Sequence, residues 1–141
     1  MLLEAPLFDG GVEDFLAATD EVRARGYGTL IGHPERCAPL MWKAGAVAAE
    51  RQAGARLQVN GFSLTGLHGA DAARWGAELI RTGQADVIAS DAHRPSRGPV
   101  LSRALAVLSA AGVPVSEDLV SATPRAFLAH GLAAARAARA A

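Results

Sequence analysis

The stretch Val87-Ile88-Ala89-Ser90-Asp91-Ala92-His93 is a short apolar run that passes directly into an acid and an imidazole. Short runs of this kind are typical of strands that are buried on both faces of a parallel sheet. Three further apolar runs lead in the same way into Glu4, into His33 and into Asn60. These strand ends recur about every 30 residues, which is the length of one βα unit. The sequence therefore predicts an α/β fold with about four parallel strands and flanking helices.

The segments between the strands have the hydrophobic period of amphipathic helices. Apolar and charged residues separate onto two faces in residues 12–25, 42–52, 70–81 and 101–111. A glycine follows each segment at a position where a helix stop is expected, at Gly26, Gly54, Gly83 and Gly112. Strands that alternate with helices of this length predict βαβ units.

The C-terminal part departs from this rhythm. Residues 113–115 predict a short additional strand, and Ser116 predicts the N-cap of a small helix with acids in its first turn. Thr123 predicts a second cap, with Pro124 as the first helical residue. We assign residues 1–131 to one domain and expect the Ala/Arg-rich residues 132–141 to form a C-terminal helix or a frayed tail.

The composition excludes several classes of function. A chain of 141 residues, half of them hydrophobic, predicts one domain with one core. The 14 basic residues balance the 14 acidic ones, so we expect no nucleic-acid partner. Every long apolar stretch is interrupted by charge, and the start lacks a basic signal region, so we expect no membrane insertion and no export. With Cys37 as its one cysteine, the chain is expected in the reducing cytoplasm.

Polar side chains with metal-binding chemistry stand at the predicted strand ends. Glu4, His33, Asp91 and His93 fall there, and carboxylate and imidazole groups are ligands of hydrolytic divalent metals. The carboxyl ends of parallel strands meet at one edge of the sheet, so we expect these four side chains to converge. Asp91 and His93 alternate on an expected extended segment, which points them the same way.

The stretch His33-Pro34-Glu35-Arg36 adds a cation beside the second strand end. Pro34 predicts an extended conformation for His33. Arg36 follows closely enough to offer a bidentate hydrogen bond to a phosphate held by the metal.

Each of these residues also has a structural interpretation. Asp91 and His93 are also compatible with a capped turn that carries a solvated histidine. His33 is compatible with a hydrogen-bonded imidazole in the core, and Glu4 is compatible with an exposed acid near a terminus. Arg36 is compatible with an ion pair to Glu35 or Asp91. Asn60 either belongs to the site or only forms a turn with the glycine after it.

Four stretches carry a resemblance to a known family. They are Gly32-His33-Pro34-Glu35-Arg36, Gln58-Val59-Asn60-Gly61-Phe62-Ser63-Leu64-Thr65-Gly66, Ile88-Ala89-Ser90-Asp91-Ala92-His93 and Thr123-Pro124-Arg125. In this order and spacing they resemble the PHP (polymerase and histidinol phosphatase) superfamily, and they are most similar to the bacterial capsule-type protein-tyrosine phosphatases of the CpsB/YwqE kind. The resemblance implies the C-terminal part of a distorted (β/α)7 barrel similar to a TIM barrel.

The resemblance implies a role for each strand-end residue. Glu4, His33, Asp91 and His93 match ligands of a centre that holds up to three divalent metal ions, taken as Mn²⁺ in the family. A metal-activated water would then hydrolyse the phosphate ester.

The resemblance also implies how substrate is held and what it is. Arg36 and Arg97 match positions that bind the substrate phosphate, and Arg94 is an alternative to Arg97. The implied substrate is a phosphotyrosine protein, a bacterial tyrosine kinase of capsule or exopolysaccharide synthesis.

The chain departs from the family in one respect. Family members open with a His-x-His strand, and roughly the first three βα units of the seven have no counterpart before Met1. The open alternatives are a phosphatase of a small molecule, such as histidinol phosphate or a nucleotide, and an inactive half-barrel that acts as a binding module. A partial barrel exposes a strand edge and an apolar sheet face, so we expect self-association and a possible oligomer.

Cys37 is the remaining candidate nucleophile. Cysteine phosphatases of another class need a Cys-x5-Arg loop, and Lys43 stands where the arginine would be required. We therefore expect Cys37 to be a buried structural residue.

Overall fold

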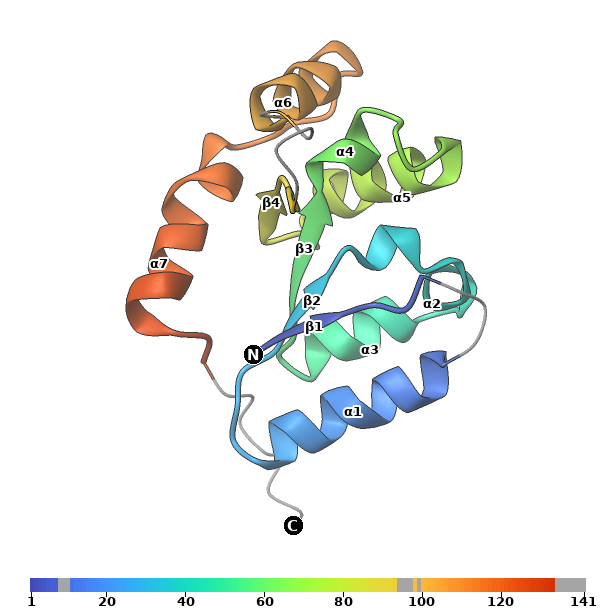
Figure 1. The fold of residues 1–141 in the computed structure, drawn as a ribbon, viewed down its shortest axis with the longest axis vertical. Helices are drawn as coiled ribbons and strands as arrows, with labels where there is room; N and C mark the ends of the chain where they lie inside the picture. Colours follow the sequence, from blue (N-terminus) through green and yellow to red (C-terminus); the bar gives the residue numbers. More distant parts are fainter. Residues whose placement is uncertain (8–10, 94–97, 99, 134–141) are drawn as a thin grey trace.

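The four predicted strands form one parallel sheet, in which they neighbour one another in the order of the sequence (Figure 1). They are β1 (Leu2–Glu4), β2 (Leu30–Gly32), β3 (Arg56–Asn60) and β4 (Val87–Ala89). The computed structural model describes residues 1–7, 11–93, 98 and 100–133. A parallel sheet in sequence order, with helices in its connections, is the arrangement found in a segment of a β/α barrel. The predicted α/β class with four parallel strands is confirmed.

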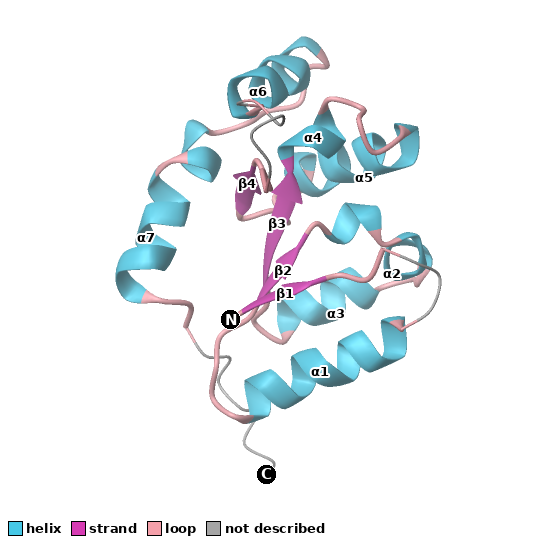
Figure 2. Cartoon of the chain, viewed as in Figure 1, coloured by secondary structure: helices cyan, strands magenta, loops and turns pink. Residues whose placement is uncertain are grey.

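Helices occupy the connections between strands and the C-terminal third of the described chain (Figure 2). They are α1 (Val12–Ala24), α2 (Ala38–Trp42), α3 (Ala46–Gln52), α4 (Gly61–Leu64), α5 (Ala70–Arg81), α6 (Leu101–Ala110) and α7 (Ala122–His130), with 3₁₀ turns η1 (Pro34–Arg36) and η2 (Glu117–Val120). Three of the four predicted helices are confirmed to within one residue, and the glycines expected at the helix stops all have positive φ.

The fourth predicted helix, over residues 42–52, is wrong as one element. The chain forms α2 and α3 instead, separated at Lys43, whose backbone is extended, and at Gly45, whose φ is 75°. A left-handed residue cannot continue a right-handed helix, so Gly45 sets the start of α3 rather than lying inside a longer helix.

Other departures fall around short segments. Residues 113–115 form no strand. Ser116 caps η2 as predicted, because its hydroxyl accepts a hydrogen bond from the Asp118 backbone N–H. The final helix begins at Ala122 with Ser121 at its cap position, so the predicted start at Thr123 and Pro124 is wrong, and Pro124 is its third residue. At this third position the missing N–H of Pro124 costs no hydrogen bond, because the first four N–H groups of a helix have no partner within the helix.

One face of the sheet packs against the helices and forms the core. Ile31 pairs in register with Leu57, and Val59 with Ile88, and all four side chains are at most 1% exposed. In-register neighbours share a face of the sheet. A Cβ added at Gly76 in α5 would lie 3.1 Å from Val59 Cγ1, so helix and strand approach closely there.

The opposite face of the sheet is more open. The register places Leu2 and Gln58 on rows that alternate with the core rows. Leu2 is 50% exposed and Gln58 is half-buried. In Figure 1, α3 and α5 lie on one side of the strands and α7 stands apart on the other, with none of its residues buried. In a closed barrel this would be the interior face.

Three further expectations bear on surface and partners. Cys37 is completely buried in the core, as predicted for a structural cysteine. Within the described ranges, no helix combines the length and hydropathy needed to cross a bilayer. β1 is an outer strand of the described sheet, with Met1 and Leu2 about half exposed, and the expected self-association stays a prediction. The division between residues 1–131 and 132–141 also stays a prediction.

The core assignment predicts a large loss of stability for Leu57→Ala. Leu57 is 1% exposed on the central row of the sheet, so its truncation should cost about 2–5 kcal/mol of the free energy of unfolding. Leu128→Ala makes the same chemical change at an 89% exposed site on α7 and should cost less than about 0.5 kcal/mol. Urea unfolding of both variants checks this, and equal losses would contradict the assigned core.

Candidate metal centre

A cavity of about 230 Å³ lies at the carboxyl end of the sheet, on its open face. All four predicted metal ligands line it. The complete lining is Leu2, Glu4, Gly32, His33, Gln58, Ala89, Asp91, Ala92 and His93. The strand ends therefore bring the predicted residues together, as the parallel topology requires.

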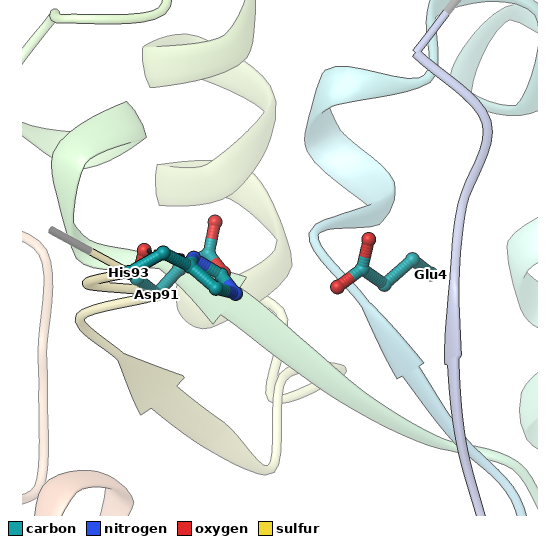
Figure 3. Close-up of side chains that lie close together, drawn as sticks. All are labelled: Glu4, Asp91 and His93. Atoms are coloured by element: carbon teal, nitrogen blue, oxygen red, sulfur yellow. Dashed lines mark hydrogen bonds and ion pairs between the residues drawn. The ribbon is translucent and has the colours of Figure 1, made fainter.

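Three of these side chains form a compact group. One ligand atom from each of Glu4, Asp91 and His93 lies within 4.8 Å of the others. Figure 3 shows the Glu4 carboxylate, on β1, directed toward Asp91 and His93, which follow β4. Atoms this close can share one divalent cation, because each metal–ligand bond is about 2.0–2.6 Å long.

His33 is adjacent to this group. Its Nε2 lies 3.8 Å from Oε2 of Glu4, and the residue is only 3% exposed. Burial, and then the nearby positive charge of Arg36, hold the pKa of His33 below its ordinary value. The imidazole is therefore neutral near pH 7, the form that donates a lone pair to a metal.

The backbone at two of the candidate ligands differs from the prediction. His33 and Asp91 were expected to be extended, but their φ angles are 40° and 51°. In the described part of the chain they are the two non-glycine residues with positive φ. Left-handed backbone is disfavoured for such residues and collects at functional sites, where the surrounding structure holds it. The His33 N–H still donates to the carbonyl oxygen of Gln58, at 2.8 Å.

Asn60 holds the group in place. Its Nδ2 donates a 2.8 Å hydrogen bond to Oδ2 of Asp91, while its Oδ1 accepts one from the Phe62 backbone N–H and so caps α4. Both interpretations left open by the sequence are therefore present, since Asn60 forms the turn and also contacts the site. Its role is to position Asp91.

Arg36, one of the predicted phosphate-binding arginines, is close to the candidate ligands. Arg36 lies beside the group, with Nη1 3.7 Å from Oδ2 of Asp91. The ion pair considered from the sequence is therefore formed, and the guanidinium also stands next to the candidate ligands. Arg97 and its alternative Arg94 lie outside the described residues.

Glu35 is a buried acid whose role was not foreseen beyond a pairing with Arg36. Its Oε1 accepts hydrogen bonds from the Asn60 backbone N–H, at 3.1 Å, and from Ser63 Oγ, at 2.7 Å. Burial raises its pKa to about 7, although both of these hydrogen bonds oppose the shift. Glu35 thus fastens η1, which carries Arg36, to the end of β3. The burial of Glu35 could not be predicted from hydrophobic periodicity, because a 3₁₀ turn is too short to show any.

The donor set fits a divalent cation with open coordination positions. Two carboxylates and two imidazoles offer mixed oxygen and nitrogen ligands, as hydrolytic metal sites do. The Glu4 side chain is 61% exposed and the His93 side chain 69% exposed, so solvent reaches the group.

The chain is similar to proteins of known class. A family model described as capsular polysaccharide synthesis, CpsB/CapC, matches residues 11–129. A chain from the crystal structures of YwqE from Bacillus subtilis and CpsB from Streptococcus pneumoniae, described as unique metal-dependent tyrosine phosphatases, matches with a TM-score of 0.62 and 26% identity. That match covers 76% of this chain and 43% of the other, so this chain spans less than half the length of that phosphatase. No curated protein sequence matches significantly.

Substitution of the left-handed residues tests the metal centre. Asparagine tolerates this backbone conformation, so Asp91→Asn and His33→Asn should fold while losing a ligand charge or an imidazole. We expect Mn²⁺ affinity, measured by isothermal titration calorimetry, to fall by about tenfold or more in each. Asp14→Asn makes the same chemical change as Asp91→Asn at an exposed position on α1. It is the matched control and should bind Mn²⁺ as the wild type does. Unchanged affinity in Asp91→Asn would rule out the assigned centre.

Glu35→Gln tests the buried acid. The pKa of Glu35 is about 7 in the folded chain and about 4.5 in the unfolded one, so folding binds a proton between these pH values. The wild type should lose stability as the pH rises from about 4.5 to about 7, while Glu35→Gln should not. As the pH rises, the difference in free energy of unfolding between the two proteins should grow to at most about 3 kcal/mol and should level off above about pH 7. Urea unfolding in EDTA across this range measures it, and a difference independent of pH would contradict the raised pKa.

Proposed function

The chain belongs to the CpsB/CapC family of capsular polysaccharide synthesis, and from that premise we propose that it carries the metal site of a protein-tyrosine phosphatase. Its predicted resemblance to the capsule-type phosphatases is confirmed by the family match and by the solved phosphatase structure. The observation that carries the proposal is the convergence of Glu4, Asp91 and His93 at the carboxyl end of a parallel sheet. Because the chain spans 43% of the solved phosphatase, the activity of the whole protein is part of the proposal.

In the proposed site, Glu4, His33, Asp91 and His93 hold the metal. A divalent cation bound there supplies Lewis-acid chemistry, activating water and neutralising negative charge on a phosphate. Neutral His33 offers its lone pair without first losing a proton. Asn60, which is fully buried, keeps Asp91 oriented through its 2.8 Å hydrogen bond.

Arg36 is proposed to bind the phosphate. A guanidinium offers several N–H donors in a fixed plane, and it stabilises charge that builds up on phosphate oxygens during transfer. The proposal is supported by the distance of 3.7 Å between Arg36 Nη1 and Oδ2 of the candidate ligand Asp91. Arg97, or Arg94 in its place, is proposed as a second phosphate contact.

The metal and the physiological substrate belong to the same proposal. We propose Mn²⁺, with up to three ions in a complete site, and a bacterial tyrosine kinase of capsule or exopolysaccharide synthesis as the substrate in the cytoplasm. The description of the matched structures as metal-dependent tyrosine phosphatases supports the reaction, and the family description supports the link to capsule synthesis.

An activity measurement separates this proposal from its alternatives. With Mn²⁺ added, the chain should hydrolyse p-nitrophenyl phosphate and a phosphotyrosine peptide, and EDTA should abolish turnover. Arg36→Ala should lower kcat/KM by about 10²–10³-fold, because it removes donors to the charged phosphate oxygens, while Mn²⁺ affinity stays unchanged. Arg36→Lys keeps the positive charge but lacks the planar guanidinium, so its kcat/KM should lie between the values of the wild type and Arg36→Ala.

The other outcomes favour other functions. A preference for histidinol phosphate or a nucleotide over the phosphopeptide would indicate a small-molecule phosphatase. A chain that binds Mn²⁺ but turns over none of these substrates would indicate a binding module.

A further inference from the structure

A second cavity, of about 390 Å³, is formed by segments that follow β1, β2 and β3. We call it the aromatic pocket and define it by Leu7, Arg36, Trp42, His68, Asp71 and Trp75. Segments at the carboxyl ends of parallel strands are where β/α folds bind ligands, so this pocket belongs to the same end of the sheet as the metal cavity. Its volume is in the range of small-molecule sites.

Two indole rings dominate the pocket. Trp42 in α2 and Trp75 in α5 meet edge to face, with centroids 5.9 Å apart and planes at 81°. Trp42 is 69% exposed and Leu7 is 48% exposed, so both remain accessible to a ligand. A large exposed aromatic surface in a pocket is a place where a further aromatic or apolar group is bound favourably.

Arg36 connects the pocket to the metal centre. Its side chain lines the aromatic pocket and also places Nη1 3.7 Å from Oδ2 of Asp91. A phosphate bound by Arg36 beside Asp91 would therefore lie next to a side chain that also lines the aromatic pocket. An ester group that enters this pocket can contact the indoles of Trp42 and Trp75.

The charges of the pocket agree with an uncharged aromatic occupant. The Asp71 carboxylate is paired with Arg74 at 2.9 Å, and the Arg74 guanidinium lies 5.6 Å from the centroid of Trp75. The charge of Asp71, one of the two acids that line the pocket, is thus paired with a cation that also lies over the Trp75 ring. Among the described residues that line the pocket, Arg36 is the one Arg or Lys.

We propose that the aromatic pocket binds the aromatic ring of an aryl phosphate ester, such as a phosphotyrosyl side chain, while Arg36 holds the phosphate. This inference rests on the proposed function and extends it, because it assigns the preference for aryl over alkyl esters to Trp42 and Trp75. These two residues are specificity determinants that lie outside the metal centre.

Tryptophan fluorescence tests the inference without requiring turnover. The chain contains two tryptophans, and both line the pocket, so its tryptophan emission reports on this site. In Mn²⁺ buffer, phenyl phosphate should change the emission saturably, whereas inorganic phosphate should change it little. Trp42→Ala should weaken phenyl phosphate binding by about tenfold and leave inorganic phosphate binding, measured by calorimetry, unchanged. Trp42→Phe should restore most of the affinity.

A matched control separates the pocket from general effects of removing an aromatic ring. Tyr27→Ala truncates a 55% exposed aromatic residue that precedes β2, at the other end of the sheet, and should leave phenyl phosphate binding unchanged. Because Trp42 is 69% exposed and packs against Trp75, its truncation should lower the urea unfolding midpoint only slightly.

Kinetics distinguish failure of this inference from failure of the proposed function. If the wild type turns over phosphate esters, Trp42→Ala should raise KM for p-nitrophenyl phosphate about tenfold more than KM for an alkyl phosphate such as phosphoserine. Equal effects on both esters, or no loss of phenyl phosphate binding, would overturn the aryl pocket and leave the phosphatase standing. Binding of phenyl phosphate that depends on Trp42, in a chain that hydrolyses nothing, would overturn the phosphatase and support the pocket.

Discussion

The hydrogen bond from Asn60 Nδ2 to Asp91 Oδ2, 2.8 Å long, ties the end of β3 to the segment after β4. Asn60 also receives support from Glu35, whose Oε1 accepts the Asn60 backbone N–H. Two buried residues without metal-binding duties thus connect the three segments that follow β2, β3 and β4. Because neighbouring parallel strands are held in register by the sheet, this connection fixes where Asp91 lies relative to His33 and Glu4. The arrangement of the candidate ligands therefore depends on this connection.

Several features at the carboxyl end of the sheet lower the free energy of unfolding but shape the candidate site. Two non-glycine residues hold a left-handed backbone, and a carboxyl group is buried at the cost of a pKa near 7. Such residues persist only where the rest of the fold compensates, which here is the well-packed helix-covered face with Ile31, Leu57 and Ile88. The open face, where Leu2 is half exposed, carries the metal cavity instead of a second core.

Much of this arrangement could be predicted from the sequence. Short apolar runs that end in Glu4, His33 and Asp91 indicated parallel strands, and that topology alone required their side chains to meet. The left-handed backbone at His33 and Asp91 was not predicted, because Pro34 favours an extended conformation for His33 and because Asp91 directly follows an apparent strand. Tertiary contacts override both preferences. The break at Gly45 was hidden inside a continuous helical period, since glycine in a helix is unfavourable but tolerated. The burial of Glu35 was also hidden, because it depends on contacts with residues about 25 positions away.

Arg36 lines the aromatic pocket and Asp91 lines the metal cavity, and the ion pair between them, at 3.7 Å, links the two sites. The proposed function depends on a divalent cation in the metal cavity. Diffraction from crystals of the chain soaked in Mn²⁺ would locate the bound Mn²⁺ ion. An anomalous difference map should contain a peak between Glu4, Asp91 and His93, about 2.0–2.6 Å from at least one oxygen and one nitrogen ligand. A map with no peak in that cavity at saturating Mn²⁺, or with peaks only on remote surface acids, would contradict the assignment of this end of the sheet as a metal centre.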